Sequence, residues 1–135
     1  MDHYTVEDDL KLLGMQVKSF PVGIPETFDK LHNTLPHGNE RDYYGISHFG
    51  KEGQIVYYTA ASTRPDDKNQ SSDFKPLTID RGEYYTITLQ DWKTKTDLIK
   101  DIFHHMMQQD TVDNKSNCIE WYRTDKEMLC MMKAK

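Results

Sequence analysis

A single acidic residue interrupts an apolar run near the C-terminus. Glu120 stands within Cys118-Ile119-Glu120-Trp121-Tyr122, whose other residues favour a strand, whereas acids are depleted in strands. Strand alternation places Glu120 on the same face as Cys118 and Tyr122, so a phenol lies beside the carboxylate and can donate a hydrogen bond to it. Glu120 and Tyr122 are therefore candidate ligand-binding residues. The alternative is an edge-strand glutamate that faces water and discourages aggregation.

Aromatic residues accompany this carboxylate on other expected strands, as the adjacent pairs Tyr43-Tyr44, Tyr57-Tyr58 and Tyr84-Tyr85. In each pair one ring faces the helix layer and its neighbour faces the opposite side. Rings around a carboxylate suit a cationic or amphipathic guest, through cation–π attraction and charge pairing. Core packing of the rings is the alternative. The candidate ligand-binding rings are Tyr44, Tyr58 and Tyr85, together with Trp92, which lies between a strand and a helix.

Other kinds of chemistry have little support in the sequence. The two cysteines, Cys118 and Cys130, lie among apolar residues without a CxxC pair and are expected to be buried, reduced thiols. His104 and His105 are adjacent on an expected helix and cannot turn both imidazoles to one metal ion. No serine stands in a GxSxG motif, and no glycine-rich phosphate loop is present. We therefore expect no catalytic metal and no cofactor.

The elements that must position these residues follow from the spacing of apolar side chains, which alternates between the periods of a strand and of a helix. This alternation predicts an α+β fold, and 135 residues suffice for a single domain spanning 1–135. The polar segment 64–73 predicts a surface loop or short linker without core residues. The expected strands are 10–19, 42–49, 54–62, 74–90 with a break at 80–82, 118–123 and 128–133, and the expected helices are 25–35 and 94–109.

Both halves of the chain follow the order strand, helix, strand, turn, strand. This order predicts an internal duplication, with pseudo-repeats at 10–62 and 74–133 and an antiparallel sheet. Each unit is expected to cover one face of its sheet with its own helix and the other face with its twin. A central ligand cleft between two facing sheets is the expected consequence.

Charge and hydropathy restrict the partners of the protein. The 17 Lys and Arg against 22 Asp and Glu leave a net charge of -5 without a basic run, which disfavours direct nucleic-acid binding. No apolar run approaches the roughly 20 residues that cross a bilayer. The acidic start of the chain lacks the basic flank and apolar stretch of a signal peptide, so we expect a cytoplasmic protein, either a monomer or a homodimer.

Short motifs in both halves resemble the GyrI-like effector-binding domain of bacterial transcription activators. They include Ile24-Pro25-Glu26-Thr27-Phe28 in the first half and, in the second, Arg81-Gly82-Glu83-Tyr84 and Ile119-Glu120-Trp121-Tyr122. The resemblance implies a two-copy strand-helix-strand-strand fold with a central cleft for cationic or hydrophobic drug-like molecules. It also places the family's pocket glutamate on Glu120.

The function implied by the resemblance is that of a small-molecule-binding module, with transcription regulation and multidrug binding as its family context. About nine residues precede the first expected strand, which leaves no room there for a DNA-binding region. Some relatives of this kind hydrolyse reactive cyclopropane-type electrophiles with the same glutamate, which gives a first alternative. Regulation through binding of a partner protein is a second alternative.

Overall fold

The computed structural model describes residues 1–67 and 74–135. Within these ranges the chain forms one antiparallel sheet of eight strands, in the order β1-β6-β8-β7-β3-β4-β2-β5, and two α-helices. The α+β prediction is therefore confirmed. The strands are β1 (Asp2–Val6), β2 (Leu10–Gln16), β3 (Tyr43–Phe49), β4 (Ile55–Ser62), β5 (Lys75–Ile79), β6 (Gly82–Gln90), β7 (Cys118–Tyr122) and β8 (Glu127–Lys133), and the helices are α1 (Ile24–Thr34) and α2 (Ile99–Met107).

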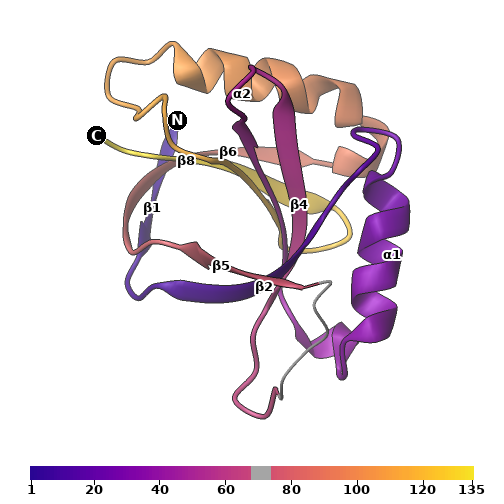
Figure 1. Ribbon diagram of the computed structural model, residues 1–135. Coiled ribbons are helices and arrows are strands. Elements are labelled where there is room, and N and C mark those ends of the chain that lie inside the picture. The colour runs from indigo at the N-terminus through magenta and orange to yellow at the C-terminus, as the bar shows by residue number, and fades with distance from the viewer. Residues whose placement is uncertain (68–73) are drawn as a thin grey trace.

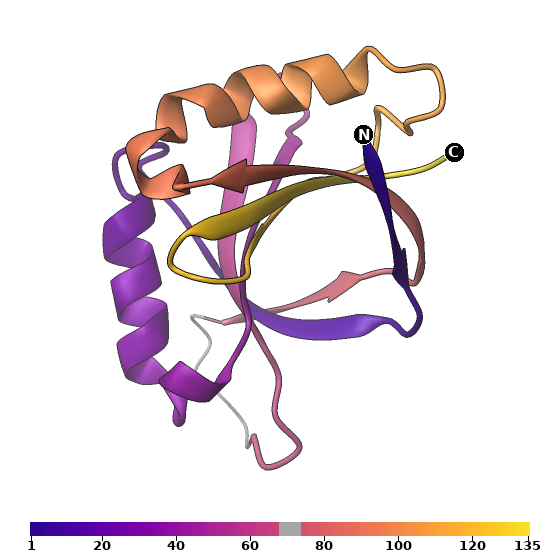
Figure 2. The same ribbon diagram turned by 180° about the vertical axis from the view of Figure 1, so that it is seen from behind.

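The sheet curls into an open half-barrel (Figures 1 and 2). Both helices lie outside this curl, with α2 across one end of the molecule and α1 along its side. The sheet thus has an outer face, which carries the helices, and an inner face, which lines the half-barrel. The two ends of the sheet order, β1 and β5, are short strands of five residues each.

The two halves of the chain meet edge to edge and not face to face. The elements β2, α1, β3, β4 and β6, α2, β7, β8 follow the same order, and β3 pairs with β7 in the middle of the sheet. The expected pair of facing sheets with a cleft between them is therefore wrong. Pairing of β3 with β7 satisfies their backbone hydrogen bonds, and curling of the single sheet then closes its inner face on itself. The duplication of the units remains a prediction.

Strand β1 is missing from the sequence-based expectation. It pairs with β6 along its whole length, from Asp2 opposite Thr86 to Val6 opposite Gly82. Only Val6 of this strand is buried, so β1 has no apolar alternation that would identify it. The expectation that about nine residues precede the first strand is therefore wrong, because β1 begins at Asp2.

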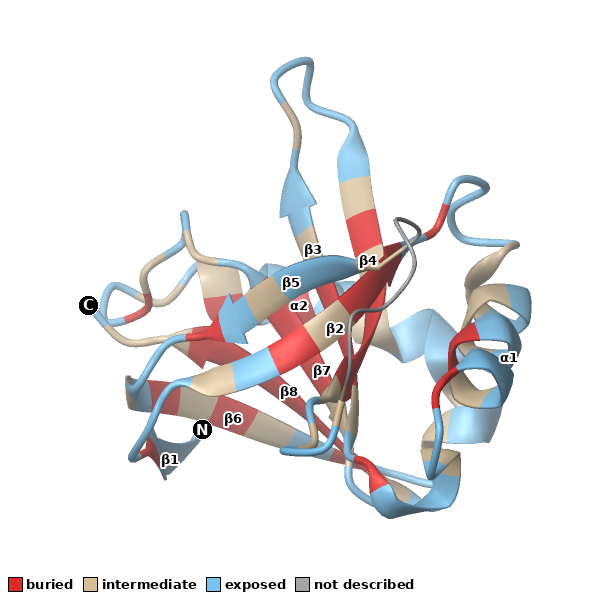
Figure 3. Cartoon of the chain, turned by 60° about the horizontal axis from the view of Figure 1, so that its bottom comes forward, coloured by how far each residue is buried: buried red, intermediate tan, exposed pale blue. Residues whose placement is uncertain are grey.

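Side chains pack in separate groups on the two faces of the sheet. The inner face holds one cluster that draws on all eight strands, and it includes Tyr44 and Tyr84. On the outer face, Phe103 and Met106 of α2 pack into a second cluster, and Leu31 of α1 packs into a third. Buried residues dominate the central strands β7 and β8, whereas β1 and β5 at the ends of the sheet are mostly exposed (Figure 3). No helix among the described residues has the length and apolar character to span a bilayer.

The segment expected to be a connector without core residues has a buried contact. Asp67 accepts two hydrogen bonds from the guanidinium of Arg41, at 2.9 and 2.6 Å, and the Arg41 side chain is fully buried. The prediction of a connector free of core contacts is therefore wrong at Asp67, because a charged residue can be buried when it is paired. Residues 68–73 of this segment lie outside the described residues.

Candidate functional site

Glu120 lies at the centre of the sheet and not at an edge. Its strand, β7, runs between β3 and β8, and Glu120 stands opposite Gly45 on one side and Cys130 on the other. Only 7% of the residue is exposed. The alternative of a water-facing edge glutamate is therefore wrong.

Two tyrosine hydroxyls converge on one oxygen of this carboxylate. The Tyr57 hydroxyl donates to Oε1 of Glu120 at 3.0 Å, and the Tyr122 hydroxyl donates to the same oxygen. The two hydroxyl oxygens are 3.3 Å apart. Tyr57 reaches this position from β4 across β3, because Gly45 of β3 has no side chain. A Cβ at Gly45 would lie 1.9 Å from the Tyr57 hydroxyl oxygen.

Three further rings cover the two tyrosines. Phe20, in the segment between β2 and α1, lies 5.4 Å from Tyr57 between ring centroids. Phe28 of α1 meets Tyr122 edge-on at 5.3 Å, and Trp92, in the 3-10 turn Trp92–Thr94, lies 4.9 Å from Tyr122. We call Glu120, Tyr57, Tyr122, Phe20, Phe28 and Trp92 the Glu120 cluster.

Burial determines the electrostatics of the Glu120 cluster. The pKa of the Glu120 carboxyl is raised, because removal from water disfavours the carboxylate more than the hydrogen bonds from Tyr122 and Tyr57 favour it. Burial, reinforced by the charge of Glu120, raises the pKa of both tyrosines well above the ordinary value. Both phenols therefore keep their protons at neutral pH and remain hydrogen-bond donors.

Glu120 has no counter-charge within the described residues. Neither of its oxygens forms an ion pair with a Lys, Arg or His of residues 1–67 and 74–135. Both hydroxyl donors are on Oε1, and no hydrogen bond from this described part of the chain reaches Oε2. A buried carboxylate without a positive partner is unfavourable in the empty site and becomes favourable when a cation arrives.

The structure brings together only some of the residues expected at the site. Tyr122 and Trp92 belong to the Glu120 cluster. Tyr44 and Tyr58 instead extend from the inner face, because Gly45 and Tyr57, their neighbours in the chain, share the outer face with Glu120. Tyr85 does lie on the outer face, but its ring packs on His3, 4.6 Å away between centroids, at the end of the sheet formed by β1 and β6.

Sequence reasoning missed two kinds of residue in the Glu120 cluster. Tyr57 belongs to a tyrosine pair that the sequence singled out, but its face follows from the register of β3 with β4 and β7. Phe20 stands before α1 without a motif around it, and Phe28 ends the motif Ile24-Pro25-Glu26-Thr27-Phe28, which did not mark it as a site residue. A helix-face argument places Phe28 against the sheet but does not name the strand it meets.

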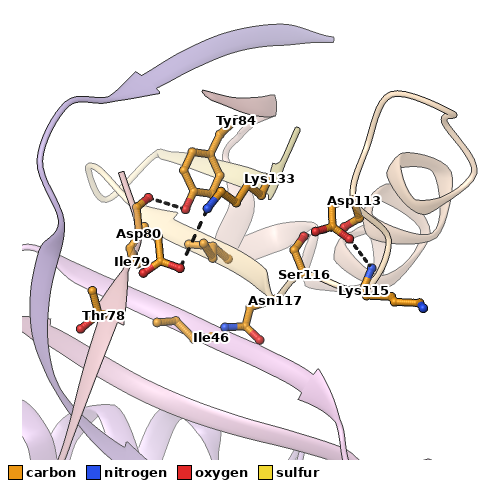
Figure 4. Close-up of a pocket in the computed structure, with 11 residues that line it drawn as sticks. Ile46, Thr78, Ile79, Asp80, Tyr84, Asp113, Lys115, Ser116, Asn117 and Lys133 are labelled. Carbon is orange, nitrogen blue, oxygen red and sulfur yellow. Dashed lines mark hydrogen bonds and ion pairs between the residues drawn. The ribbon is translucent and has the colours of Figure 1, made fainter. Parts of the chain in front are cut away.

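Two hollows in the described part of the structure lie on the inner face, away from Glu120. One, of about 330 Å³, is lined by Asp80, Tyr84, Lys115 and Lys133 among others (Figure 4). Its polar groups partner one another: the Tyr84 hydroxyl donates to the Asp80 carbonyl at 2.7 Å, and the Lys133 ammonium lies 4.0 Å from the Asp80 carboxylate. This hollow therefore offers a ligand few unpaired charges.

Cysteines and metal ligands add nothing to the Glu120 cluster. Cys118 and Cys130 are free thiols, both buried as expected. Burial, followed by the charge of Glu120, raises the pKa of Cys118 to about 11, so that the thiol is unreactive at neutral pH. Across the described ranges, no three His, Cys, Asp or Glu side chains form a group that can hold a metal ion.

Comparisons with known proteins identify similar structures but no similar sequence. No protein-family model matches the chain. No curated protein matches it. An integron cassette protein from the mobile metagenome of Vibrio cholerae has a TM-score of 0.70 at 10% identity, over 99% of this chain and 95% of that chain.

Two further similar structures are a complex with an organic cation and a hydrolase. SAV2435, solved bound to tetraphenylphosphonium, has a TM-score of 0.66 at 14% identity, over 99% of this chain and 93% of that chain. A hydrolase from Listeria innocua has a TM-score of 0.64 at 9% identity, over 99% of this chain and 90% of that chain. The chain shares the fold of these proteins along nearly its whole length. This fold is consistent with the GyrI-like resemblance of the sequence motifs.

Proposed function

We propose that the protein binds organic cations with aromatic or hydrophobic groups and holds the positive charge at Glu120. The observation that carries this proposal is a buried carboxylate at the centre of the sheet, hydrogen-bonded by two tyrosines and without a cationic partner among the described residues. The rings of the Glu120 cluster supply stacking and cation–π surfaces for such a guest. The net charge of -5 further favours a cationic ligand over a nucleic acid.

Access to the carboxylate runs between the covering rings. Phe20 is 39% exposed, and Trp92 is half-buried and belongs to a short 3-10 turn outside the sheet. Both rings stand on connecting segments, which move more easily than the strands that carry Glu120, Tyr57 and Tyr122. We propose that a ligand displaces Phe20 and Trp92 and stacks on the tyrosines. The tetraphenylphosphonium bound to SAV2435 is a suitable probe, because it is a hydrophobic cation with four aromatic rings.

Glu120→Gln should weaken the binding of tetraphenylphosphonium by about 1–3 kcal/mol, because the substitution removes the charge and preserves the side-chain volume. The affinity of the parent protein should fall as the pH drops through the raised pKa of Glu120, since the protonated acid no longer attracts a cation. The Glu120→Gln variant should lack this dependence. Isothermal titration calorimetry over a pH series measures both effects.

The matched control is Glu52→Gln, which removes the same charge from the exposed turn between β3 and β4 and should leave the affinity unchanged. Triphenylphosphine oxide, a neutral compound with similar rings, should bind the parent and Glu120→Gln equally. Equal affinity of the parent and Glu120→Gln for tetraphenylphosphonium would contradict the assignment of Glu120 as the binding carboxylate.

Hydrolysis of a strained electrophile is the second candidate function, favoured by the contact between phenols and a carboxylate of raised pKa. Glu120 would take a proton from a water molecule as the water oxygen attacks a ring carbon. The ring bond to that carbon breaks, and a tyrosine hydroxyl donates a proton to the leaving atom. The similar structure from Listeria innocua is described as a hydrolase.

Turnover of epoxide-bearing and cyclopropane-bearing compounds tests this second function. The rate should rise with pH through the raised pKa of Glu120, because a general base must be deprotonated. Tyr122→Phe should lower the rate as well, since it removes one of the two donors to Oε1. A rate no higher than that of Glu120→Gln for every compound would exclude hydrolysis and leave the binding proposal standing.

A further inference from the structure

The inner face of the half-barrel carries a second group of aromatic side chains. Tyr4 of β1, Tyr44 of β3 and Trp121 of β7 line a cavity of about 150 Å³ together with Asp42. The Tyr4 and Trp121 centroids are 5.4 Å apart with the rings edge-on, and Tyr44 and Trp121 are 6.1 Å apart with an interplanar angle of 22°. Three strands thus contribute rings to one space on the face opposite the Glu120 cluster.

Asp42 gives this cavity a negative charge. It stands two residues before Tyr44, so both side chains extend to the inner face. Within residues 1–67 and 74–135 no Lys, Arg or His forms an ion pair with Asp42. Burial raises the pKa of Tyr44, and the charge of Asp42 is the next largest cause, which shows that this charge acts on the phenol.

Trp121 already contacts a cation. The Arg123 guanidinium carbon lies 5.0 Å from the Trp121 ring centroid, and the same guanidinium pairs with Glu127 at 3.2 Å. The cavity lining does not include Arg123, so this contact leaves the cavity that the three rings border open. The indole therefore offers the cavity an electron-rich surface of the kind that attracts positive charge.

The size of the cavity and its small number of hydrogen-bond acceptors indicate which kind of cation it can bind. Its volume of about 150 Å³ is below the roughly 300–1,000 Å³ of pockets for drug-sized ligands, so it takes a small group. A primary ammonium or a guanidinium needs several hydrogen-bond acceptors, whereas a quaternary ammonium has no N–H to satisfy. Aromatic faces with one nearby carboxylate match the second kind of group.

We propose that Tyr4, Tyr44, Trp121 and Asp42 form a second ligand site, which binds a small methylated ammonium group such as the head of choline. This site is independent of the Glu120 cluster, because the sheet separates the two. Val6, Leu10, Ile79 and Met131 complete the cavity wall with apolar surface, which excludes water from the methyl groups.

The two tryptophans of the chain report the two sites separately. Trp121 lines the inner cavity, and Trp92 belongs to the Glu120 cluster. In a nitrogen–proton correlation spectrum of the labelled protein, choline should shift the indole N–H signal of Trp121 and leave that of Trp92 in place. The uncharged isostere 3,3-dimethylbutan-1-ol should shift Trp121 only at much higher concentration.

Variants at exposed positions test the site with little risk to the fold. Asp42→Asn and Tyr4→Leu should each weaken choline binding about threefold to tenfold, as expected for loss of a charge or of one aromatic face. Glu120→Gln should leave choline binding unchanged. Equal binding of choline and the alcohol would overturn the proposal, as would a choline response at Trp92 that Glu120→Gln removes and Asp42→Asn does not.

Discussion

Asp67→Ala should lower the free energy of unfolding by about 3–5 kcal/mol, because it leaves the buried guanidinium of Arg41 without its anion. Arg41 keeps hydrogen bonds to the carbonyl oxygens of Pro36 and Ser62, at 3.0 and 2.9 Å, but neither acceptor carries a charge. Urea denaturation at neutral pH measures the loss. The ion pair joins Arg41, which lies just before β3, to the start of the connecting segment, so its removal should also increase proteolysis there.

Asp66→Ala is the matched control for this prediction. Asp66 pairs with Arg64 at 3.3 Å, but its side chain is 62% exposed, so its removal should change the stability by less than about 1 kcal/mol. Similar small losses in both variants would show that the buried pair contributes little.

The stability difference between the parent and Asp67→Ala should depend on pH in a defined direction. The hydrogen bonds from Arg41 lower the pKa of Asp67 from 3.8 to about 2. A carboxyl whose pKa is lower in the folded state stabilises the fold fully above its unfolded pKa and loses this contribution as the pH falls through the folded value. The difference should therefore be constant above about pH 4 and shrink between about pH 4 and pH 2.

Local patterns predicted most of the fold, because a helix or a strand shows its period within a few residues. The hairpin of β3 and β4 and the stripe of Phe103 and Met106 on α2 lie where the apolar spacing placed them. Strand β1 was not predicted, because its side chains are mostly exposed and because its partner, β6, lies about 80 residues further along the chain. The pairing of β3 with β7 was missed for the same reason, because it joins residues about 75 positions apart in the chain, such as Gly45 and Glu120.

The sequence was sufficient to predict the carboxylate of the candidate site, but not all of the aromatic rings around it. Glu120 differs in kind from its neighbours, so one strand is enough to single it out. Which member of Tyr43-Tyr44 or Tyr57-Tyr58 shares its face depends on the register across β4, β3 and β7. A shift of one residue in that register would exchange Tyr57 for Tyr58, and the sequence of a single strand contains no information on it.

Gly45→Ala should disrupt the Glu120 cluster although it replaces none of the residues that form it. The new Cβ would lie 1.9 Å from the Tyr57 hydroxyl oxygen, 2.7 Å from Cζ of the same ring and 3.1 Å from Oε1 of Glu120. Tyr57 is only 2% exposed and has no free space to move into. We expect a loss of about 2–3 kcal/mol in stability from overpacking and the broken hydrogen bond, together with loss of tetraphenylphosphonium binding.

The cause of this effect can be isolated by a double-mutant cycle with Tyr57→Phe, measured by urea denaturation. Tyr57→Phe removes the hydroxyl oxygen that makes the shortest contact, so Gly45→Ala should cost about 0.5–3 kcal/mol less in that background. The control is Gly14→Ala on β2, whose Cβ would lie 2.4 Å from Cδ1 of the flexible Leu77 side chain and at an ordinary contact distance of 3.4 Å from the Lys75 carbonyl oxygen. Because Leu77 can turn aside at the edge of the sheet, Gly14→Ala should be nearly neutral. Additive losses in the cycle would mean that Gly45 does not make room for the Tyr57 hydroxyl, and the approach of Tyr57 to Glu120 would need another explanation.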